Sequence, residues 1–252
     1  MIIANWKMNG TSQSVTDWIN SVSGNIDIDN LNPCIFCPPT CYLDHARKLI
    51  NKNDHRIELG SQIVNYSFEG ESLTGGISAT MLADLGIKYV MVGHSEQRDI
   101  LKESNSVITK KIEKALDDDL SVIYCIGEDI DIKNKKETQL FLSHQLDVLG
   151  KLSSIYEVKL GSIKVAYEPI WAIGSGLNAE KDYIEEIHEF IKKYINNHLG
   201  WSKLDIYPPV LYGGSVNLEN SKEIISLTDV DGLLIGGASL NPETFCKIYN
   251  LS

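Results

Sequence analysis

Short apolar stretches rich in β-branched residues recur along this chain, and longer stretches with a different hydrophobic spacing separate them. In the short stretches both alternating positions are apolar, which is typical of parallel strands covered on both faces. They begin about 33 residues apart on average and lie at residues 2–7, 35–37, 57–62, 89–93, 121–126, 163–167, 210–213 and 232–235. The longer stretches carry apolar residues three and four positions apart, which predicts amphipathic helices. These lie at residues 15–23, 43–52, 78–85, 107–117, 138–149, 181–199, 218–227 and 242–249.

The alternation of eight strands with eight helices predicts a (β/α)8 barrel, in which eight parallel strands are ringed by helices. An open, doubly wound sheet is the alternative, but eight units would make it unusually wide. No linker rich in glycine, serine or proline divides the sequence, and the repeats share a period without sharing a sequence. We therefore expect one α/β domain over residues 1–252 rather than several domains or a solenoid.

The composition is that of an ordinary globular protein, with 43% hydrophobic and 23% charged residues. Acidic residues outnumber basic ones by 34 to 23, and the net charge of −11 would repel nucleic acid and anionic membranes. We therefore expect neither partner. A small anionic substrate is compatible with this charge, provided that local donors outweigh it.

Cysteine usage and the first residues indicate an intracellular compartment. Five cysteines are too few for a disulfide scaffold, and an odd number suits reduced thiols. The opening sequence MIIANWKMNG lacks the basic and then apolar layout of a signal peptide. No apolar run approaches the ~18 residues that span a bilayer. These features predict a cytoplasmic protein.

Polar and glycine residues follow directly after seven of the eight predicted strands. In a (β/α)8 barrel the carboxyl ends of all strands meet at one rim, where the active sites of this fold lie. The residues expected at this rim are Asn5, Lys7, Gln62, His94, Ser95, Glu96, Cys125, Gly127, Glu128, Glu168, Gly213, Gly214, Ser215, Gly236 and Gly237.

Two glycine pairs at this rim indicate a phosphate site. Gly213-Gly214 and Gly236-Gly237 each end a strand and precede a predicted helix. Glycine lets backbone N–H groups approach an anion, and a helix N-terminus adds a favourable dipole. One such pair is more often a tight turn, but two pairs after strands seven and eight stand where this fold usually binds phosphate.

Glu168 opens the most informative stretch of the chain. A carboxylate at the end of a strand can act as a general base. Pro169 stiffens the chain that follows, and Gly174 and Gly176 permit a sharp turn, so residues 169–179 have the composition of a lid over a site. A solvated surface loop is the alternative, but it would leave Trp171 exposed without a reason.

His94 and Lys7 complete the candidate chemistry. A lone histidine after a strand is more often a core residue, and a lone lysine is more often solvated. Their expected position on the rim that holds Glu168 favours a shared site instead.

Six ordered motifs resemble the triosephosphate isomerase family along essentially the whole chain. They are ANWKMNG (4–10), GHSE (93–96), CIGE (125–128), AYEPIWAIGSG (166–176), YGGSV (212–216) and DGLLIGGASL (231–240). The resemblance implies interconversion of dihydroxyacetone phosphate and D-glyceraldehyde 3-phosphate, in glycolysis and gluconeogenesis, without a metal or an organic cofactor.

The resemblance also implies a role for each matching residue. Glu168 would move a proton between two carbons through an enediolate, and His94 would polarise the carbonyl as a neutral imidazole. Lys7 and Asn5 would bind substrate, and Glu96 would orient Lys7. Backbone N–H groups would hold the phosphate, and they belong to Gly174, Ser215, Gly236 and Gly237.

The family closes its lid over the substrate, which implies the same for residues 169–179. Closure keeps water out and prevents loss of phosphate from the enediolate. The residues that would latch the open and closed positions are Glu128, Tyr167, Trp171, Tyr212 and Ser215.

The resemblance further implies a symmetric homodimer in which Leu73 and Thr74 of loop 71–76 dock beside Lys7 and Glu96 of the second copy. Two positions at this contact depart from the family pattern. Gly76 stands where glutamate is usual, and Gln97 stands where arginine is usual, so we expect no ion pair between them.

Three other functions are alternatives to an isomerase. A glycosidase could use Glu96 and Glu168 as its two carboxylates, but two phosphate cradles in so short a chain disfavour it. An iron–sulfur or other metal protein is suggested by Cys34, Cys37 and Cys41, but a cluster needs a fourth ligand, and Cys34 and Cys37 should face opposite sides of a strand. A non-catalytic phosphosugar-binding or surface-interaction protein would not need Lys7, His94 and Glu168 together.

Overall fold

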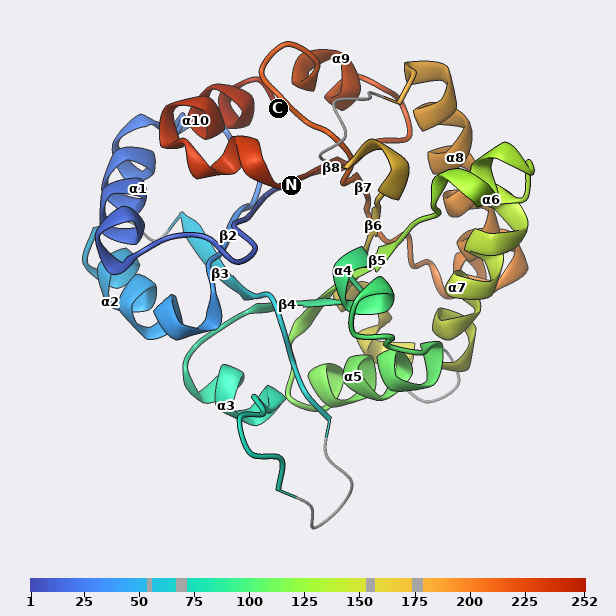
Figure 1. Cartoon of the computed structure of the whole chain (residues 1–252), viewed down its shortest axis with the longest axis horizontal. Coiled ribbons are helices and arrows are strands. Elements are labelled where there is room, and N and C mark those ends of the chain that lie inside the picture. The colour runs from blue at the N-terminus through green and yellow to red at the C-terminus, as the bar shows by residue number, and fades with distance from the viewer. Residues whose placement is uncertain (54–55, 67–71, 153–156, 174–178) are drawn as a thin grey trace.

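The chain forms a closed barrel of eight parallel strands with helices around the outside, as predicted (Figure 1). This computed structural model describes residues 1–53, 56–66, 72–152, 157–173 and 179–252. Each strand pairs with its neighbour in sequence, and β8 pairs with β1. That pairing closes the sheet and excludes the open, doubly wound alternative. The strands are β1 (Ile2–Asn5), β2 (Cys34–Cys37), β3 (Ile57–Ser61), β4 (Tyr89–Val92), β5 (Ser121–Ile126), β6 (Ile163–Tyr167), β7 (Val210–Tyr212) and β8 (Gly232–Ile235).

Eight helices match the predicted ones with small differences at their ends. They are α1 (Ser12–Asn25), α2 (Leu43–Asn53), α3 (Ala79–Asp84), α5 (Asn105–Asp117), α7 (Thr138–Leu152), α8 (Lys181–Lys193), α9 (Ser221–Ile225) and α10 (Pro242–Asn250). Helix α8 ends earlier than expected, and a π-helical turn (Tyr194–His198) continues it.

Two short helices lie in the connections on the rim and were not predicted. Helix α4 (Ser95–Asp99) begins directly after His94, and α6 (Ile130–Asn134) begins after Asp129. The His94 and Asp129 side chains accept hydrogen bonds from backbone N–H groups in the first turns. Each helix has five residues, which is too short for a hydrophobic period to show in the sequence.

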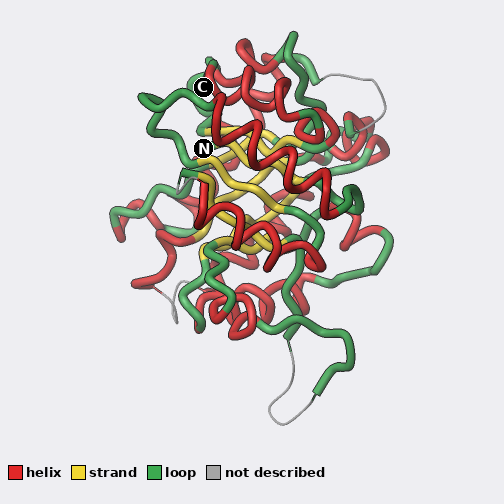
Figure 2. The backbone as a smooth tube through the Cα atoms, turned by 90° about the vertical axis from the view of Figure 1, so that its left-hand side faces the viewer, coloured by secondary structure: helices red, strands yellow, loops and turns green. Residues whose placement is uncertain are grey.

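The apolar side chains divide into an inner and an outer layer. The inner layer fills the barrel and includes Ile3, Cys37 and Ile123, while a larger layer packs the strands against the helices. Figure 2 shows the strands at the centre with helices on either side. Cys34 belongs to the outer layer and Cys37 to the inner one. They therefore face opposite sides of β2, as expected, and cannot bind one metal cluster together.

The described parts of the connection between β3 and α3, residues 62–66 and 72–78, extend away from the body of the barrel in both views (Figures 1 and 2). The Leu73 side chain on this connection is 60% exposed. No helix in the described part of the chain is long and apolar enough to cross a membrane.

Candidate active site

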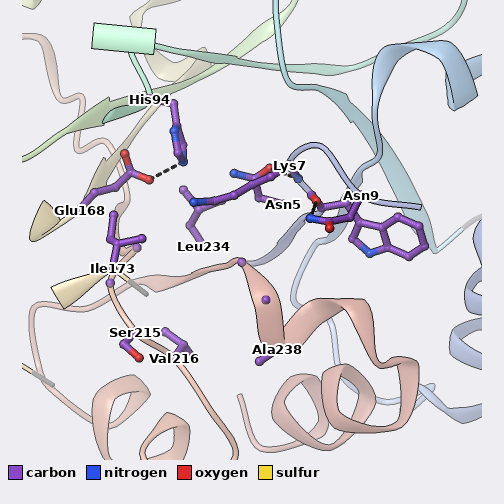
Figure 3. A pocket seen from close by; sticks show the side chains of 15 residues that line it. Asn5, Lys7, Asn9, His94, Glu168, Ile173, Ser215, Val216, Leu234 and Ala238 are labelled. Carbon is purple, nitrogen blue, oxygen red and sulfur yellow. Dashed lines mark hydrogen bonds and ion pairs between the residues drawn. The ribbon is translucent and has the colours of Figure 1, made fainter. Parts of the chain in front are cut away.

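A cavity of about 300 Å³ opens at the carboxyl ends of the strands, where the polar residues were expected to meet. Figure 3 shows Glu168 and His94 on one side, with Lys7 reaching toward them. Predicted site residues that line this cavity are Asn5, Lys7, His94, Glu168, Ser215, Gly236 and Gly237. Ile173 of the predicted lid also lines it, and the lining residues that had no predicted role are Trp6, Asn9, Val216, Leu234 and Ala238. Gly174 lies outside the described residues.

Glu168 and His94 form a buried, directly bonded pair. The Glu168 side chain is 3% exposed and the His94 side chain is 7% exposed, and Oε1 of the glutamate lies 2.9 Å from Nε2 of the histidine. Oε2 of Glu168 accepts a hydrogen bond of 3.1 Å from the backbone N–H of Ser95, at the start of α4. The carboxylate is therefore held at both oxygens. One of the two donors is Ser95, which was expected at the rim but had no predicted role.

Hydrogen bonding assigns a tautomer to His94. The backbone N–H of Glu96 donates to Nδ1 of His94 at 3.3 Å. An accepting Nδ1 carries no proton, so in the neutral ring the proton lies on Nε2 and points to Glu168. Burial lowers the pKa of His94, but the Glu168 carboxylate outweighs burial and raises it above the ordinary value of 6.5.

Lys7 reaches the cavity from a backbone conformation that few residues adopt. Its φ of 51° lies in the left-handed region, which is uncommon for a residue other than glycine. The Lys7 N–H donates to Oδ1 of Asn5 at 3.0 Å, and its carbonyl accepts from Nε2 of Gln62 at 3.0 Å. Its Nζ lies 2.8 Å from Oε1 of Glu96. Backbone bonds on either side and an ion pair thus fix where the ammonium lies.

Glycine is required where the chain passes Glu168. A Cβ atom on Gly127 would lie 1.8 Å from the Glu168 carbonyl oxygen, and one on Gly213 would lie 3.0 Å from Glu168 Cγ. Glu168 N–H donates to Ile126 O at 2.7 Å, and Gly213 N–H donates to Tyr167 O at 2.7 Å. These two glycines let β5 and β7 approach β6 closely enough to bury the carboxylate.

The second glycine pair leaves open space at the cavity wall. A Cβ atom on Gly237 would meet no atom within 4 Å, and one on Gly236 would lie 3.7 Å from Cε of Lys7. Ser215 and Gly214 line the cavity beside them. A phosphate group fits this chemistry, because backbone groups are accessible and one ammonium lies near them.

Three of the five expected latch residues gather beside the cavity. Oε1 of Glu128 accepts from Tyr167 Oη at 3.0 Å and from Trp171 Nε1 at 2.9 Å. Burial raises the pKa of Glu128, although these donors oppose it. Tyr212 is paired with Tyr167 across β6 and β7, and the two rings lie 6.2 and 5.8 Å from that of His188, while Ser215 lines the cavity itself.

Two residues at this cluster had no predicted role. Tyr183 Oη donates to Oε1 of Glu128 at 2.8 Å, and the Lys133 ammonium lies 3.4 Å from the centre of the Trp171 ring. Nothing in the spacing of α8 distinguishes Tyr183 from Phe190, the other half-buried aromatic residue on that helix. Lys133 lies on α6, a helix that the sequence pattern did not show.

The geometry disfavours the other enzyme classes. Glu168 lines the cavity, whereas Glu96 does not and is held by Lys7, so these carboxylates do not face a common substrate as a glycosidase pair would. Among the described residues, no three side chains of His, Cys, Asp or Glu are grouped to hold a metal ion.

Comparison with known proteins agrees with this site. The family model described as triosephosphate isomerase matches residues 1–252. The chain is 39% identical to a triosephosphate isomerase of Neurospora crassa over 246 residues, which cover 98% of this chain and 95% of the relative. It is 39% identical to one of Blochmanniella floridana, over 100% and 95% of the two chains. It is also 39% identical to a triosephosphate isomerase of Colwellia psychrerythraea, over 97% of this chain and 94% of the relative. With the barrel, the buried glutamate–histidine pair and the whole-length match, the chain belongs to the triosephosphate isomerase family.

Proposed function

We propose that this protein interconverts dihydroxyacetone phosphate and D-glyceraldehyde 3-phosphate by proton transfer through an enediolate, as a step of glycolysis and gluconeogenesis. The observation that carries the proposal is the buried pair of Glu168 and His94 in a cavity that also holds the Lys7 ammonium. A general base, a hydrogen-bond donor and a cation are the groups that enolisation of a carbonyl compound requires. Membership of the family supports the same substrate.

Glu168 acts as the base and His94 as the electrophile. In triosephosphate isomerases this division of roles is established, with the histidine neutral. Here an accepting Nδ1 leaves Nε2–H as the donor that would polarise a substrate oxygen. Substrate bound between the two side chains would separate the imidazole from the carboxylate that raises its pKa. Burial would then favour the neutral ring.

Lys7 and Asn5 bind the substrate, and Lys7 offsets the negative charge that develops on its oxygen. Glu96 orients Lys7 through the ion pair of 2.8 Å. The fixed backbone at Lys7 supports this role, because a group that is already in place need not reorganise during the reaction.

The phosphate is held by backbone N–H groups of Gly174, Ser215, Gly236 and Gly237. The open space at Gly237 supports this placement, since a side chain there would enter the cavity. No metal ion or organic cofactor takes part in this scheme.

Residues 169–179 act as a lid that closes on the phosphate. The latch residues are Glu128, Tyr167, Trp171, Tyr212 and Ser215. Ile173 lines the cavity, which supports a lid that approaches the substrate from this side. Closure would shield the enediolate from water and so prevent loss of phosphate.

We further infer a homodimer in the cytoplasm. Leu73, on the connection that projects from the barrel, is 60% exposed, and Met8 beside the site is 96% exposed. A contact with a second copy of the chain would bury these apolar side chains. The five cysteines all lie in the described part of the chain and form no disulfide there, which suits a reducing compartment. Residues 1–252 act as one domain, because the barrel closes between β1 and β8.

A coupled assay with glyceraldehyde 3-phosphate, run without added metal, tests the proposed reaction. We expect turnover by the wild type and almost none by Glu168→Gln, which keeps the shape of the side chain but cannot accept the proton. A non-catalytic phosphosugar-binding protein would bind substrate without turnover, and that result would contradict the proposal.

Light scattering tests the dimer. Thr74→Arg would bury an unpaired charge at the contact, which typically costs several kcal/mol. We expect twice 28.1 kDa for the wild type and a largely monomeric, poorly active variant. A monomeric wild type with full activity would contradict the dimer.

A further inference from the structure

A cation and two aromatic rings lie beside the buried carboxylate at the entrance of the loop that follows β6. We call this group the Trp171 cluster, and define it as Glu128, Lys133, Tyr167, Trp171 and Tyr183. Its members come from separate parts of the rim: the end of β5, α6, the end of β6, the 3-10 turn Ile170–Ala172, and α8. Through these contacts the loop after β6 is held against the connection after β5, which includes α6, and against α8.

Glu128 binds this loop at two points. Its backbone carbonyl accepts from Ile170 N–H at 3.0 Å, and its Oε1 accepts from Trp171 Nε1 at 2.9 Å. The same Oε1 accepts from the hydroxyl groups of Tyr167 and Tyr183. Burial raises the pKa of Tyr183 to about 12, so its hydroxyl is a donor at neutral pH. All three side-chain donors are uncharged.

Lys133 supplies the positive charge that these donors lack. Its Nζ lies 3.4 Å from the centre of the Trp171 ring and 5.1 Å from that of Tyr183. The two rings meet edge to face, with centres 5.9 Å apart. Within the described part of the chain, Lys133 forms no ion pair with a carboxylate, so its ammonium faces the rings rather than a competing anion.

The arrangement has a physical consequence for Trp171. A cation over the face of an indole is attracted by the negative charge of the ring face. It also draws electron density from the ring, which makes Nε1–H a better donor to Glu128. The contact with Lys133 and the hydrogen bond to Glu128 therefore reinforce each other, and both hold the indole in one orientation.

We propose that Lys133 is a positioning residue for the reaction, which it serves by clamping Trp171 against Glu128 and so fixing the loop entrance beside the site. Trp171 stands between Glu168 and Ile173, both of which line the cavity. Freeing the indole would let this segment leave the arrangement in which Ile173 closes one wall. The fraction of protein ready to bind substrate would fall, and the apparent affinity would fall by the same factor.

This inference rests on the proposed isomerase reaction for its kinetic consequence, but not for its structural one. Lys133→Met removes the ammonium while keeping a long side chain. Lys135→Met is the matched control, because it removes the same charge from an exposed position two residues away, where no ring contact is present among the described residues. Lys133→Arg restores a cation that can lie over the indole.

Kinetics give the first measurement. We expect Lys133→Met to raise KM by roughly 2- to 30-fold while kcat changes by less than about twofold, which corresponds to the usual strength of a cation–π contact. Lys135→Met should leave KM unchanged, and Lys133→Arg should restore most of the affinity. The control separates positioning from a general loss of attraction for an anionic substrate.

Fluorescence gives the second measurement, which needs no substrate. Trp6, Trp18 and Trp201 are buried, whereas Trp171 is partly exposed, so quenching by acrylamide reports mainly on Trp171. We expect stronger quenching in Lys133→Met than in Lys135→Met. Tyr183→Phe, which keeps the ring but removes one hydrogen bond to Glu128, should change quenching in the same direction.

The two measurements separate this inference from the proposed reaction. If the wild type shows no isomerase activity, the proposed reaction is wrong, and quenching still decides whether Lys133 holds Trp171. If Lys133→Met matches Lys135→Met in both KM and quenching, the positioning role is wrong even though the isomerase activity stands.

Discussion

Adding one methyl group at Gly127, which is not among the residues that line the cavity, is expected to disable the site. The Cβ atom of Gly127→Ala would lie 1.8 Å from the Glu168 carbonyl oxygen, and contacts under 3.0 Å are essentially never found. The Glu168 backbone would therefore have to move by about 1.2 Å, and overpacking of this kind costs roughly 1–3 kcal/mol. The barrel is expected to tolerate that cost and remain folded.

The kinetic effect of the displacement should be much larger than its effect on stability. A shift of about 1 Å in a catalytic group can lower a rate roughly 100-fold. We therefore expect kcat of Gly127→Ala to fall by about 100-fold. KM should be nearly unchanged, because Ser215, Gly236 and Gly237, the residues proposed to bind the phosphate, stay in place. Gly213→Ala should have a smaller effect, since its Cβ would lie 3.0 Å from Glu168 Cγ.

A coupled assay at saturating substrate, together with thermal unfolding, checks this prediction. Gly161→Ala is the matched control, because a Cβ atom there meets nothing within 4 Å and the position lies just before β6. The control should keep wild-type kcat and Tm. A folded Gly127→Ala variant with kcat within about threefold of wild type would refute the reasoning that this close approach positions Glu168.

Three further predictions concern the base, the phosphate site and a buried histidine. Glu168→Asp should lower kcat by at least roughly 100-fold with little change in KM, because the shorter side chain withdraws the carboxylate from the proton; near-normal turnover would contradict this. Gly237→Ala should fold normally, since its Cβ has open space, but should raise KM by roughly tenfold or more because the methyl group enters the cavity; an unchanged KM would place the phosphate elsewhere. Burial lowers the pKa of His188 to about 3. Below about pH 6.5 the histidine is therefore protonated in the unfolded chain but stays neutral in the folded protein. The free energy of unfolding should fall as the pH drops from 6.5 toward 3, and the loss should be about 2 kcal/mol at pH 5. Urea unfolding at pH 7 and pH 5 checks this, and His188→Gln should show a smaller dependence on pH than the wild type.

Strands that are apolar on both faces could be located closely from the pattern of residues alone. Strands β5, β6 and β8 begin and end where predicted. Strand β1 was expected to reach Lys7 but ends at Asn5, because Lys7 takes a left-handed conformation that no strand accommodates. A hydrophobic pattern carries no sign of such a conformation, which the bonds to Asn5 and Gln62 stabilise.

Contacts between different rim connections could not be predicted. The meeting of Glu168 with the Ser95 N–H depends on α4, and the meeting of Lys133 with Trp171 depends on α6. Both helices are too short to leave a period in the sequence. The order of the strands predicts which residues share the rim. Which of these residues contact one another depends on the folded conformation of the connections.

The isomerisation of dihydroxyacetone phosphate in D2O tests the central claim most directly. If Glu168 carries a proton between two carbons through an enediolate, the carboxyl group can exchange with solvent while the intermediate is bound. We predict that the recovered glyceraldehyde 3-phosphate contains deuterium on the carbon that received the proton, and that Glu168→Gln forms almost no product. Product that retains all of its hydrogen, as a direct hydride shift would give, or rapid turnover by Glu168→Gln, would contradict the account.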